Sequence, residues 1–198
     1  LKLPLETSEK AEDIELFKKI FEILDRHNIG YFFYIGGNDS MDTVYKLSEY
    51  AKICDYEIRV IGVPKTVDND LMATDHTPGF GSAAKYVAAS ILEVAHDTYI
   101  YNTRSVLIVE IMGRDAGWLT AAAALPSLYS DVAPDLVYLP EVPFDFDNFY
   151  ADLEKAFEKH PNVVVAVSEG VRFADGHYVG EGTQTGAKDA FGHAYLAG

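Results

Sequence analysis

Short apolar runs alternate with longer amphipathic segments along this chain, and this alternation limits the choice of fold more than any other feature of the sequence. Residues 31–35 are all aromatic or β-branched, which is the pattern of a strand buried on both faces of a parallel sheet. Residues 11–27 carry apolar side chains at intervals of three and four, which predicts an amphipathic helix that ends near Asn28 and Gly30. The start of the chain therefore predicts a helix followed by a buried strand.

The same alternation continues to residue 167. We expect further helices over residues 41–51, 81–97, 116–125 and 146–160, and further strands over residues 57–63, 105–111, 136–139 and 163–167. Alternating helices and strands form parallel sheets that are covered by helices and joined by right-handed crossovers. The sequence therefore predicts an α/β protein with three αβα layers and mostly parallel sheets. The turn-rich residues 73–79 are the best candidate for a domain boundary, which would divide the chain into residues 1–73 and 74–198.

The charge of the chain excludes several classes of partner. Its 198 residues include 16 Lys and Arg against 31 Asp and Glu, which gives a formal charge of −15. Nucleic acids and anionic membranes bind basic surfaces, so neither is an expected partner. No apolar run approaches the roughly 20 residues that span a bilayer, and the single cysteine, Cys54, cannot form an internal disulfide. We therefore expect a cytoplasmic protein.

Residues that suit a phosphorylated ligand follow four of the expected strands, where open parallel sheets bind their ligands. Gly36 and Gly37 follow the first strand and precede Asn38, Asp39 and Ser40. Glycines let the backbone approach a phosphate, and a helix that begins here would offer free N–H groups. A Gly-Gly sequence is more often plain turn geometry, so this motif is weak by itself.

The loop after the second strand combines a cation, a hydroxyl and two carboxylates, in Lys65, Thr66, Asp68 and Asp70. In an extended segment, Asp68 and Asp70 would face the same side. One could then act as a general base, and the other could orient a substrate or a metal ion. The alternative interpretation is an Asx-rich turn whose side chains cap nearby backbone.

Arg114 and Glu169 follow two later strands. An arginine at this point can spread over the equatorial oxygens of a phosphoryl group during its transfer, or it can simply pair with an acid such as Asp115 at the surface. Glu169 can accept hydrogen bonds from sugar hydroxyls, or it can be solvated. Suitable residues after four successive strands together indicate a phosphorylated, polyhydroxylated substrate.

Five motifs, taken in order, resemble those of the 6-phosphofructokinases, and within that family those of the pyrophosphate-dependent branch. They are residues 36–40 (GGNDS), 64–70 (PKTVDND), 74–83 (TDHTPGFGSA), 112–114 (MGR) and 140–141 (PE). The resemblance implies the phosphofructokinase fold, which has Rossmann-like halves. It also implies that residues 1–73 form part of the domain that binds the phosphoryl donor, and residues 74–198 part of the domain that binds the sugar phosphate, both incomplete.

The resemblance further implies a reaction. Asp68 would be the general base that takes the proton from the 1-hydroxyl of fructose 6-phosphate, with Thr66 and Asp70 beside it in the active site. Arg114 and Lys65 would stabilise the transferring phosphoryl group. The family reaction gives fructose 1,6-bisphosphate, depends on Mg²⁺, and in the pyrophosphate-dependent branch runs reversibly in glycolysis and gluconeogenesis.

Substrate binding is implied for residues on both sides of the third strand. Met112, Gly113 and Glu169 would hold the sugar. Arg104 is similar to an arginine that reaches the 6-phosphate across a subunit interface, which implies a homo-oligomer of at least two subunits.

The donor site is implied to comprise Gly37, Asn38, Asp39, Ser40 and Lys65. Family members that use ATP usually have glycines where this chain has Asp39 and Lys65, which leaves room for the nucleotide. A carboxylate would exclude that extension, and an ammonium group suits compact pyrophosphate. Asp39 and Asn38 are also the implied protein ligands of Mg²⁺. The two substitutions favour pyrophosphate as the donor.

Two other functions remain open, namely an ATP-dependent 6-phosphofructokinase and a non-catalytic subunit that binds sugar phosphate. A nicotinamide-dependent dehydrogenase is disfavoured because no G-x-G-x-x-G motif follows residue 35. The chain begins without Met and ends soon after an expected helix start at Lys188. We therefore expect an internal piece of a longer protein that is inactive by itself.

Overall fold

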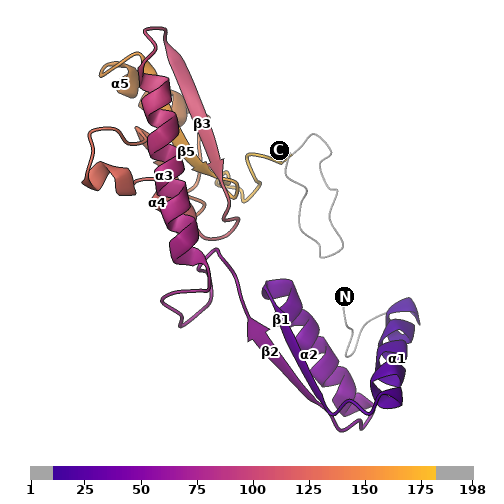
Figure 1. The fold of residues 1–198 in the computed structure, drawn as a ribbon. Helices are drawn as coiled ribbons and strands as arrows, with labels where there is room; N and C mark the ends of the chain where they lie inside the picture. The colour runs from indigo at the N-terminus through magenta and orange to yellow at the C-terminus, as the bar shows by residue number, and fades with distance from the viewer. Residues whose placement is uncertain (1–10, 182–198) are drawn as a thin grey trace. The chain divides into compact units, whose positions relative to one another are not determined.

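The computed structural model describes residues 11–181, which form two compact units that divide between Lys65 and Thr66 (Figure 1). This division lies upstream of the turn-rich residues 73–79. Val67 accounts for the difference, because its side chain packs against the core of the second unit. The assignment of a donor half and a sugar half stays a prediction, and the helix start expected at Lys188 lies outside the described residues.

The first unit consists of two parallel strands and two helices. They are α1 (Ala11–Arg26), β1 (Tyr31–Gly36), α2 (Asn38–Ile53) and β2 (Arg59–Pro64). The strands pair in register from Tyr31 opposite Arg59 to Gly36 opposite Pro64. Parallel strands need a crossover connection, and α2 supplies it. As a result, both strands end at the same edge of the sheet.

Helices α1 and α2 cover one face of this first sheet. Phe17 of α1 is fully buried against Tyr50 of α2, with their ring centroids 5.1 Å apart. The other face exposes Tyr31, Phe33 and Ile35, each by 60% or more. The expectation that residues 31–35 are buried on both faces is therefore wrong for the described chain, because its two helices pack on one face only.

The second unit is built on a three-stranded parallel sheet with the strand order β3-β5-β4. Its elements are α3 (Phe80–Tyr99), β3 (Ser105–Ile111), α4 (Trp118–Ala122), the 3₁₀ helix η1 (Leu125–Leu128), β4 (Leu136–Tyr138), α5 (Phe146–Phe157) and β5 (Asn162–Ser168). The central strand β5 is buried along almost its whole length. Strand β3 coincides with the strand expected over residues 105–111.

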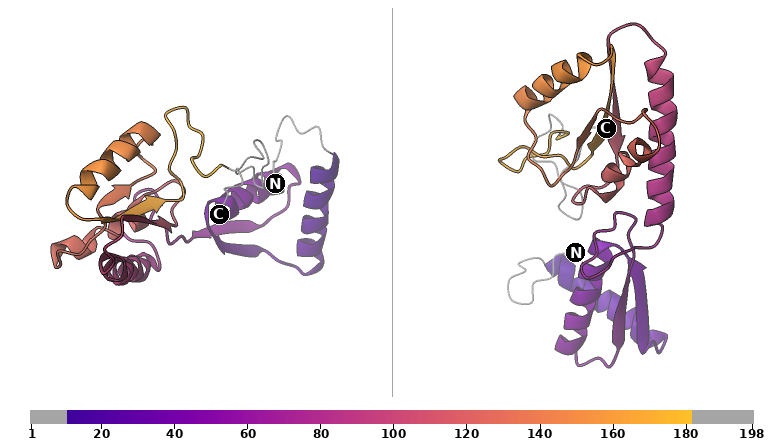
Figure 2. Two further views of the ribbon diagram at one scale, coloured as in Figure 1. Left: turned by 90° about the horizontal axis from the view of Figure 1, so that it is seen from above. Right: turned by 90° about the vertical axis from the view of Figure 1, so that its left-hand side faces the viewer.

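Helices cover both faces of this second sheet. On one face, Ile91 of α3 and Leu119 of α4 pack against Ala166 of β5. On the other face, Leu153 of α5 packs against Val165 of β5. The left view of Figure 2 shows α3 and α5 on opposite sides of the sheet. The three αβα layers expected from the sequence are therefore confirmed in this unit.

The helix expected over residues 116–125 is shorter than predicted. α4 ends at Ala122, and η1 follows as a separate turn. Pro126 lies in the first turn of η1. A proline there fits a helix start, but it would remove a hydrogen bond and clash inside a continuous helix. The predicted helix stopped before Pro126, but α4 already ends at Ala122, and η1 begins as a new turn around the proline.

Among the described helices, α3 is the longest, with 20 residues. None of the helices within residues 11–181 combines the length and the apolar character that crossing a membrane would require.

Candidate active site

The strand ends of the first unit bring Gly36 and Lys65 together. The backbone N–H of Lys65 donates a hydrogen bond of 2.9 Å to the carbonyl of Gly36. Gly37 is the N-cap of α2, so residues 38–40 form the first turn of this helix rather than a separate loop. The N–H groups of a first helical turn lack partners within the helix and favour anions. All the residues expected to bind the donor therefore lie at one edge of this unit.

Asn69 shapes the loop that carries Asp68 and Asp70. Its backbone has a φ of 60°, so the segment is not extended at this point and the argument from strand alternation does not apply. The Asn69 side chain is only 8% exposed. It accepts a hydrogen bond of 2.8 Å from the N–H of Thr77 and donates one of 3.3 Å to the carbonyl of Asp75. These two bonds hold the loop against the segment that precedes α3.

Hydrogen bonds join the loops that follow β3 and β5. The register of these strands places Ile111 opposite Ser168. Just beyond them, the N–H of Gly113 donates to Glu169 Oε1 over 3.1 Å, and the hydroxyl of Ser168 donates to the carbonyl of Gly113 over 2.6 Å. The structure thus brings residues 112–114 together with Glu169, as expected for strands that end at one edge of a parallel sheet.

Two glycines allow these loops to approach each other. Gly113 has a φ of 135°, a conformation that residues with a side chain rarely adopt. A Cβ atom on Gly170 would collide with the backbone carbonyl of Arg114. The backbone of Arg114 therefore rests directly on Gly170, which fixes where the Arg114 side chain begins.

Burial raises the pKa of Asp68 above the ordinary aspartate value, because it penalises the charged carboxylate. The negative charges of Asp70, Glu169 and Asp115 raise this pKa further, whereas a hydrogen bond with Thr66 lowers it. Within residues 11–181, the buried Oδ1 of Asp68 has no hydrogen-bond partner. A half-buried carboxylate with a raised pKa is suited to accept a proton.

Arg114 directly precedes Asp115 in the loop after β3. Its side chain is half-buried, and it makes neither a hydrogen bond nor an ion pair with another residue of the described range 11–181. Asp115, the surface partner considered for it from the sequence, instead pairs with Arg172. The Arg114 guanidinium is therefore available to an anionic ligand.

Three further residues shape the site, although the sequence predicted no role for any of them. Besides Asn69, they are Glu141, whose Oε1 accepts a hydrogen bond of 2.7 Å from the N–H of Gly117 just before α4, and Arg172. Asn69 and Glu141 lie within the motifs quoted above, and asparagine is enriched at positive φ. Arg172 carries no local signal, because its partner Asp115 is distant in the sequence.

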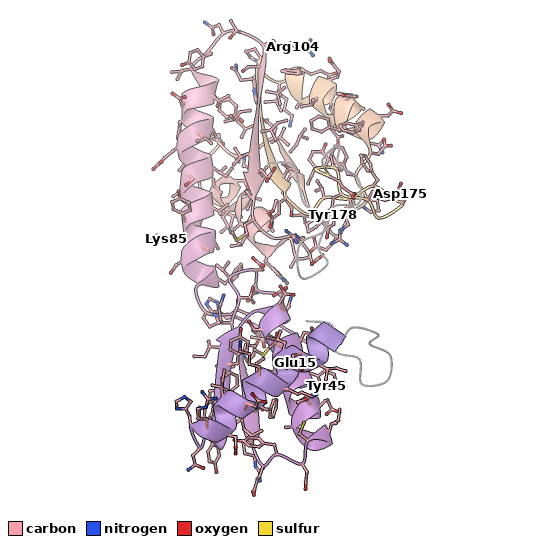
Figure 3. All side chains as sticks on the ribbon, turned by 90° about the vertical axis from the view of Figure 1, so that its right-hand side faces the viewer. Glu15, Tyr45, Lys85, Arg104, Asp175 and Tyr178 are labelled. Carbon is pink, nitrogen blue, oxygen red and sulfur yellow. The ribbon has the colours of Figure 1, made fainter. Side chains whose placement is uncertain are left out.

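Arg104 lies at the opposite end of β3 from residues 112–114. Its guanidinium donates to both carboxylate oxygens of Glu154, each over 2.7 Å, and lies 4.0 Å from the centroid of the Phe157 ring. Figure 3 labels Arg104 beside the start of β3, and Tyr178 in the segment after β5, toward the other end of the sheet. The structure therefore does not bring Arg104 together with the other residues expected to bind the sugar phosphate.

The residues expected to bind Mg²⁺ are Asn38 and Asp39, in the first turn of α2. In the described part of the chain, no group of three or more His, Cys, Asp or Glu side chains could hold a metal ion. Protein Mg²⁺ sites of enzymes that act on phosphates commonly use one or two carboxylates together with phosphate oxygens of the substrate. One carboxylate and one amide oxygen beside a helix N-terminus fit a site of that kind.

Known proteins resemble this chain over most of its length. A phosphofructokinase family profile matches residues 3–194. The pyrophosphate–fructose 6-phosphate 1-phosphotransferase of Rhodospirillum rubrum is 44% identical over 195 residues, which cover 98% of this chain and 48% of that protein. The protein of the same name from Xanthomonas campestris pv. campestris is 46% identical over 189 residues, which cover 94% of this chain and 45% of that protein.

A solved structure agrees with these matches. The crystal structure of a pyrophosphate-dependent phosphofructokinase from Nitrosospira multiformis has a TM-score of 0.71 and 42% identity to this chain, and the match covers 84% of this chain and 43% of that one. This chain spans about half the length of the relatives that it matches. The fold expected from the motifs is confirmed, and the chain belongs to the phosphofructokinase family.

Proposed function

We propose that the full-length protein transfers a phosphoryl group from pyrophosphate to the 1-hydroxyl of fructose 6-phosphate, which gives fructose 1,6-bisphosphate and inorganic phosphate in a reversible reaction. The half-buried carboxylate of Asp68 carries this proposal. Its pKa is raised by burial and then by nearby negative charges, which come from Asp70 in its own loop and from Glu169 and Asp115 in the loops after β5 and β3. Relatives that are named for this reaction match nearly the whole chain, which supports the same assignment.

Asp68 is the general base in this proposal. Phosphoryl transfer passes through a loose transition state, so the attacking hydroxyl needs to lose its proton only as the new P–O bond forms. A carboxylate accepts that proton more readily when its pKa is raised. Thr66 accepts a hydrogen bond of 3.0 Å from the backbone N–H of Asp68, and this contact orients the loop that presents the base.

Arg114 and Lys65 are the cations that stabilise the group in transfer. Arg114 has its guanidinium available among the described residues, and Gly170 fixes its backbone. A planar guanidinium can donate to two phosphoryl oxygens at once, whereas the ammonium of Lys65 acts as a compact point charge. Together they offset the negative charge that spreads over the phosphoryl oxygens in the transition state.

The first turn of α2 binds the donor in this proposal. The N-terminus of α2 faces the phosphate oxygens in this proposal, and the carboxylate of Asp39 in its first turn would exclude a nucleotide. Lys65 follows β2 at the same edge and favours a compact anion. Asn38 and Asp39 would also hold Mg²⁺, which when bound neutralises charge on the phosphate oxygens.

Met112, Gly113 and Glu169 hold the sugar in this proposal. Arg104 reaches the 6-phosphate of a neighbouring subunit, for which it must release Glu154, and the active protein is then a homo-oligomer. We further propose that the protein is cytoplasmic, because its single cysteine, Cys54, cannot form an internal disulfide.

Replacement of Asp39 and Lys65, which select the donor in this proposal, provides its test. In the full-length protein, Asp39→Gly together with Lys65→Gly is expected to shift the preference between donors from pyrophosphate toward ATP, measured as the ratio of kcat/KM for the two donors at saturating fructose 6-phosphate and Mg²⁺. An unchanged ratio would contradict the role of these two residues. The 198-residue chain alone is expected to show no turnover, and measurable turnover by it would contradict that expectation.

A further inference from the structure

The segment after β5 folds back on itself as a short hairpin. Arg172 pairs with Tyr178 through an isolated antiparallel bridge. The N–H of Phe173 donates a hydrogen bond of 2.9 Å to the carbonyl of His177, which closes the turn. The carbonyl of Arg172 accepts a hydrogen bond of 2.7 Å from the N–H of Phe144. The backbone of Arg172 is therefore held from two sides.

The side chain of Arg172 is held as firmly as its backbone. Its Nη2 donates to the Tyr178 hydroxyl over 2.7 Å, and its guanidinium lies 4.4 Å from the centroid of the Tyr178 ring. The same Nη2 is paired with Oδ1 of Asp115. Contacts to Tyr178 orient the guanidinium before it meets Asp115, so less side-chain freedom is lost when the ion pair forms.

Asp115 connects this hairpin to the loop after β3. It directly follows Arg114, whose backbone carbonyl rests on Gly170. The start of the loop is held by Glu169 and Ser168, which contact Gly113. At its far end, the N–H of Gly117 bonds Glu141. All these contacts hold the backbone of the loop, whereas Arg172 contacts a side chain, that of Asp115.

We propose that Arg172 is a positioning residue that fixes the loop of residues 112–115 through its ion pair with Asp115, and so keeps the Arg114 side chain in place for phosphoryl transfer. The proposal rests on the function proposed above for Arg114. Arg172 touches neither substrate nor donor in this account. It acts through Asp115, and the Tyr178 side chain supports it.

The pair also limits the negative charge around the general base. Asp70, Glu169 and Asp115 all act on Asp68, and Arg172 places a positive charge against the last of these three. An isolated surface ion pair contributes little to stability. The Arg172–Asp115 pair therefore acts mainly by fixing the position of the loop and by offsetting negative charge near Asp68. Its loss should lower catalysis more than the stability of the fold.

Hydrogen exchange tests the positional claim without any need for activity. The variants are Arg172→Met, Asp115→Asn and the double variant in the full-length protein, with Arg59→Met as a matched control for the loss of an exposed arginine beside an acid. We expect amides of residues 112–117 to exchange faster in all three variants and at the wild-type rate in the control. Residues 85–95 of α3 serve as an internal reference and are expected to keep their rates.

Kinetics with pyrophosphate and fructose 6-phosphate test the catalytic consequence. Arg172→Met is expected to lower kcat by about tenfold, since a small displacement of a catalytic group costs on the order of 10- to 100-fold, while KM for fructose 6-phosphate changes much less. Because the two side chains act as one pair, the double variant is expected to be no worse than the more impaired single variant.

The positioning role of Arg172 and the proposed function of the protein are contradicted by different results. Unchanged exchange over residues 112–117 in Arg172→Met would overturn the positioning role, whatever happens to kcat. Equal acceleration in α3 would also overturn it, because the effect would then be a general loss of stability. Single effects on kcat that simply multiply in the double variant would overturn the coupling through Asp115. A wild-type protein without turnover would instead contradict the proposed function, and exchange would still decide the role of Arg172.

Discussion

Burial raises the pKa of Asp68, which makes its carboxylate a better base. The same burial lowers the stability of the folded protein when this carboxylate is charged. Because its pKa in the folded protein lies above that of an unfolded aspartate, folding favours the protonated carboxyl. The stability that Asp68 contributes is therefore present at pH values below the unfolded pKa and is lost as the pH rises through the folded pKa. At pH values above the folded pKa, the ionised carboxylate lowers the stability of the second unit.

Replacement of this side chain separates activity from stability. Asp68→Asn is expected to lower kcat by about 10²- to 10⁴-fold, the usual contribution of a general base. The midpoint of thermal unfolding at pH 7 is expected to rise, because the buried charge is gone. This gain shrinks as the pH falls through the pKa of Asp68, since the wild-type carboxyl then becomes neutral as well. Steady-state kinetics and thermal unfolding at several pH values measure both effects.

An exposed aspartate of the same unit provides the control for Asp68→Asn. Asp97 lies near the end of α3 and is exposed, so Asp97→Asn is expected to leave kcat unchanged. An unchanged kcat in Asp68→Asn would exclude this residue as the base. A lower unfolding midpoint at pH 7 would contradict the cost that we assign to its burial.

Asn69 stabilises the loop that carries Asp68 through the hydrogen bonds of its side-chain amide. Asn69→Ala would leave the buried N–H of Thr77 and the carbonyl of Asp75 without these partners, at a cost of about 1–3 kcal/mol. It would also free the loop that presents Asp68, so kcat is expected to fall together with the free energy of unfolding in urea. Asn148→Ala, at an exposed position on α5, is the matched control. Equal stability of the two variants would show that the Asn69 bonds contribute nothing.

At the scale of elements, the loops after β3 and β5 lie so close together that Gly170 has no room for a side chain. A methyl group at this position would displace the carbonyl of Arg114, and such overpacking typically costs about 1–3 kcal/mol. Gly170→Ala is therefore expected to lower the free energy of unfolding and to lower kcat through Arg114. Gly30→Ala is the control, because a Cβ there would meet open space. A Gly170→Ala protein as stable and active as the control variant would contradict this packing.

Most elements were predictable because each has a local signal. Strand β3 carries a continuous apolar run and was placed without error, and α1 shows the apolar spacing of an amphipathic helix. The prediction was too long at α4, where a run of alanines continues beyond the point at which the helix ends. It also failed for the burial of β1, because an apolar run does not reveal how many helices will cover it.

The candidate site was predictable in part. Arg114 and Glu169 follow two paired strands of one parallel sheet, whose geometry brings these strand ends to one edge. Asp68 follows a strand of the other sheet, so the same geometry does not explain its place. The link from Arg172 to Asp115 depends on the path of the hairpin after β5, which no short sequence pattern specifies. The roles assigned to individual site residues stay predictions.

At the scale of the whole molecule, the charge of −15 opposes the anionic substrates that we propose. Binding must then come from a few local groups, and the ones that we propose are Lys65, Arg114 and the N-terminus of α2. These groups belong to two separate compact units, and the chain spans about half the length of its relatives. For both reasons, tests of activity require the full-length protein.

The most direct test of the proposed function is the choice of phosphoryl donor by the full-length wild-type protein. Phosphorylation of fructose 6-phosphate is measured in the presence of Mg²⁺, with either pyrophosphate or ATP as the only donor. Turnover with pyrophosphate and none with ATP is the predicted result. Turnover with ATP alone would contradict the role of Asp39 and Lys65, and binding of the sugar phosphate without turnover by either donor would contradict the proposed reaction itself.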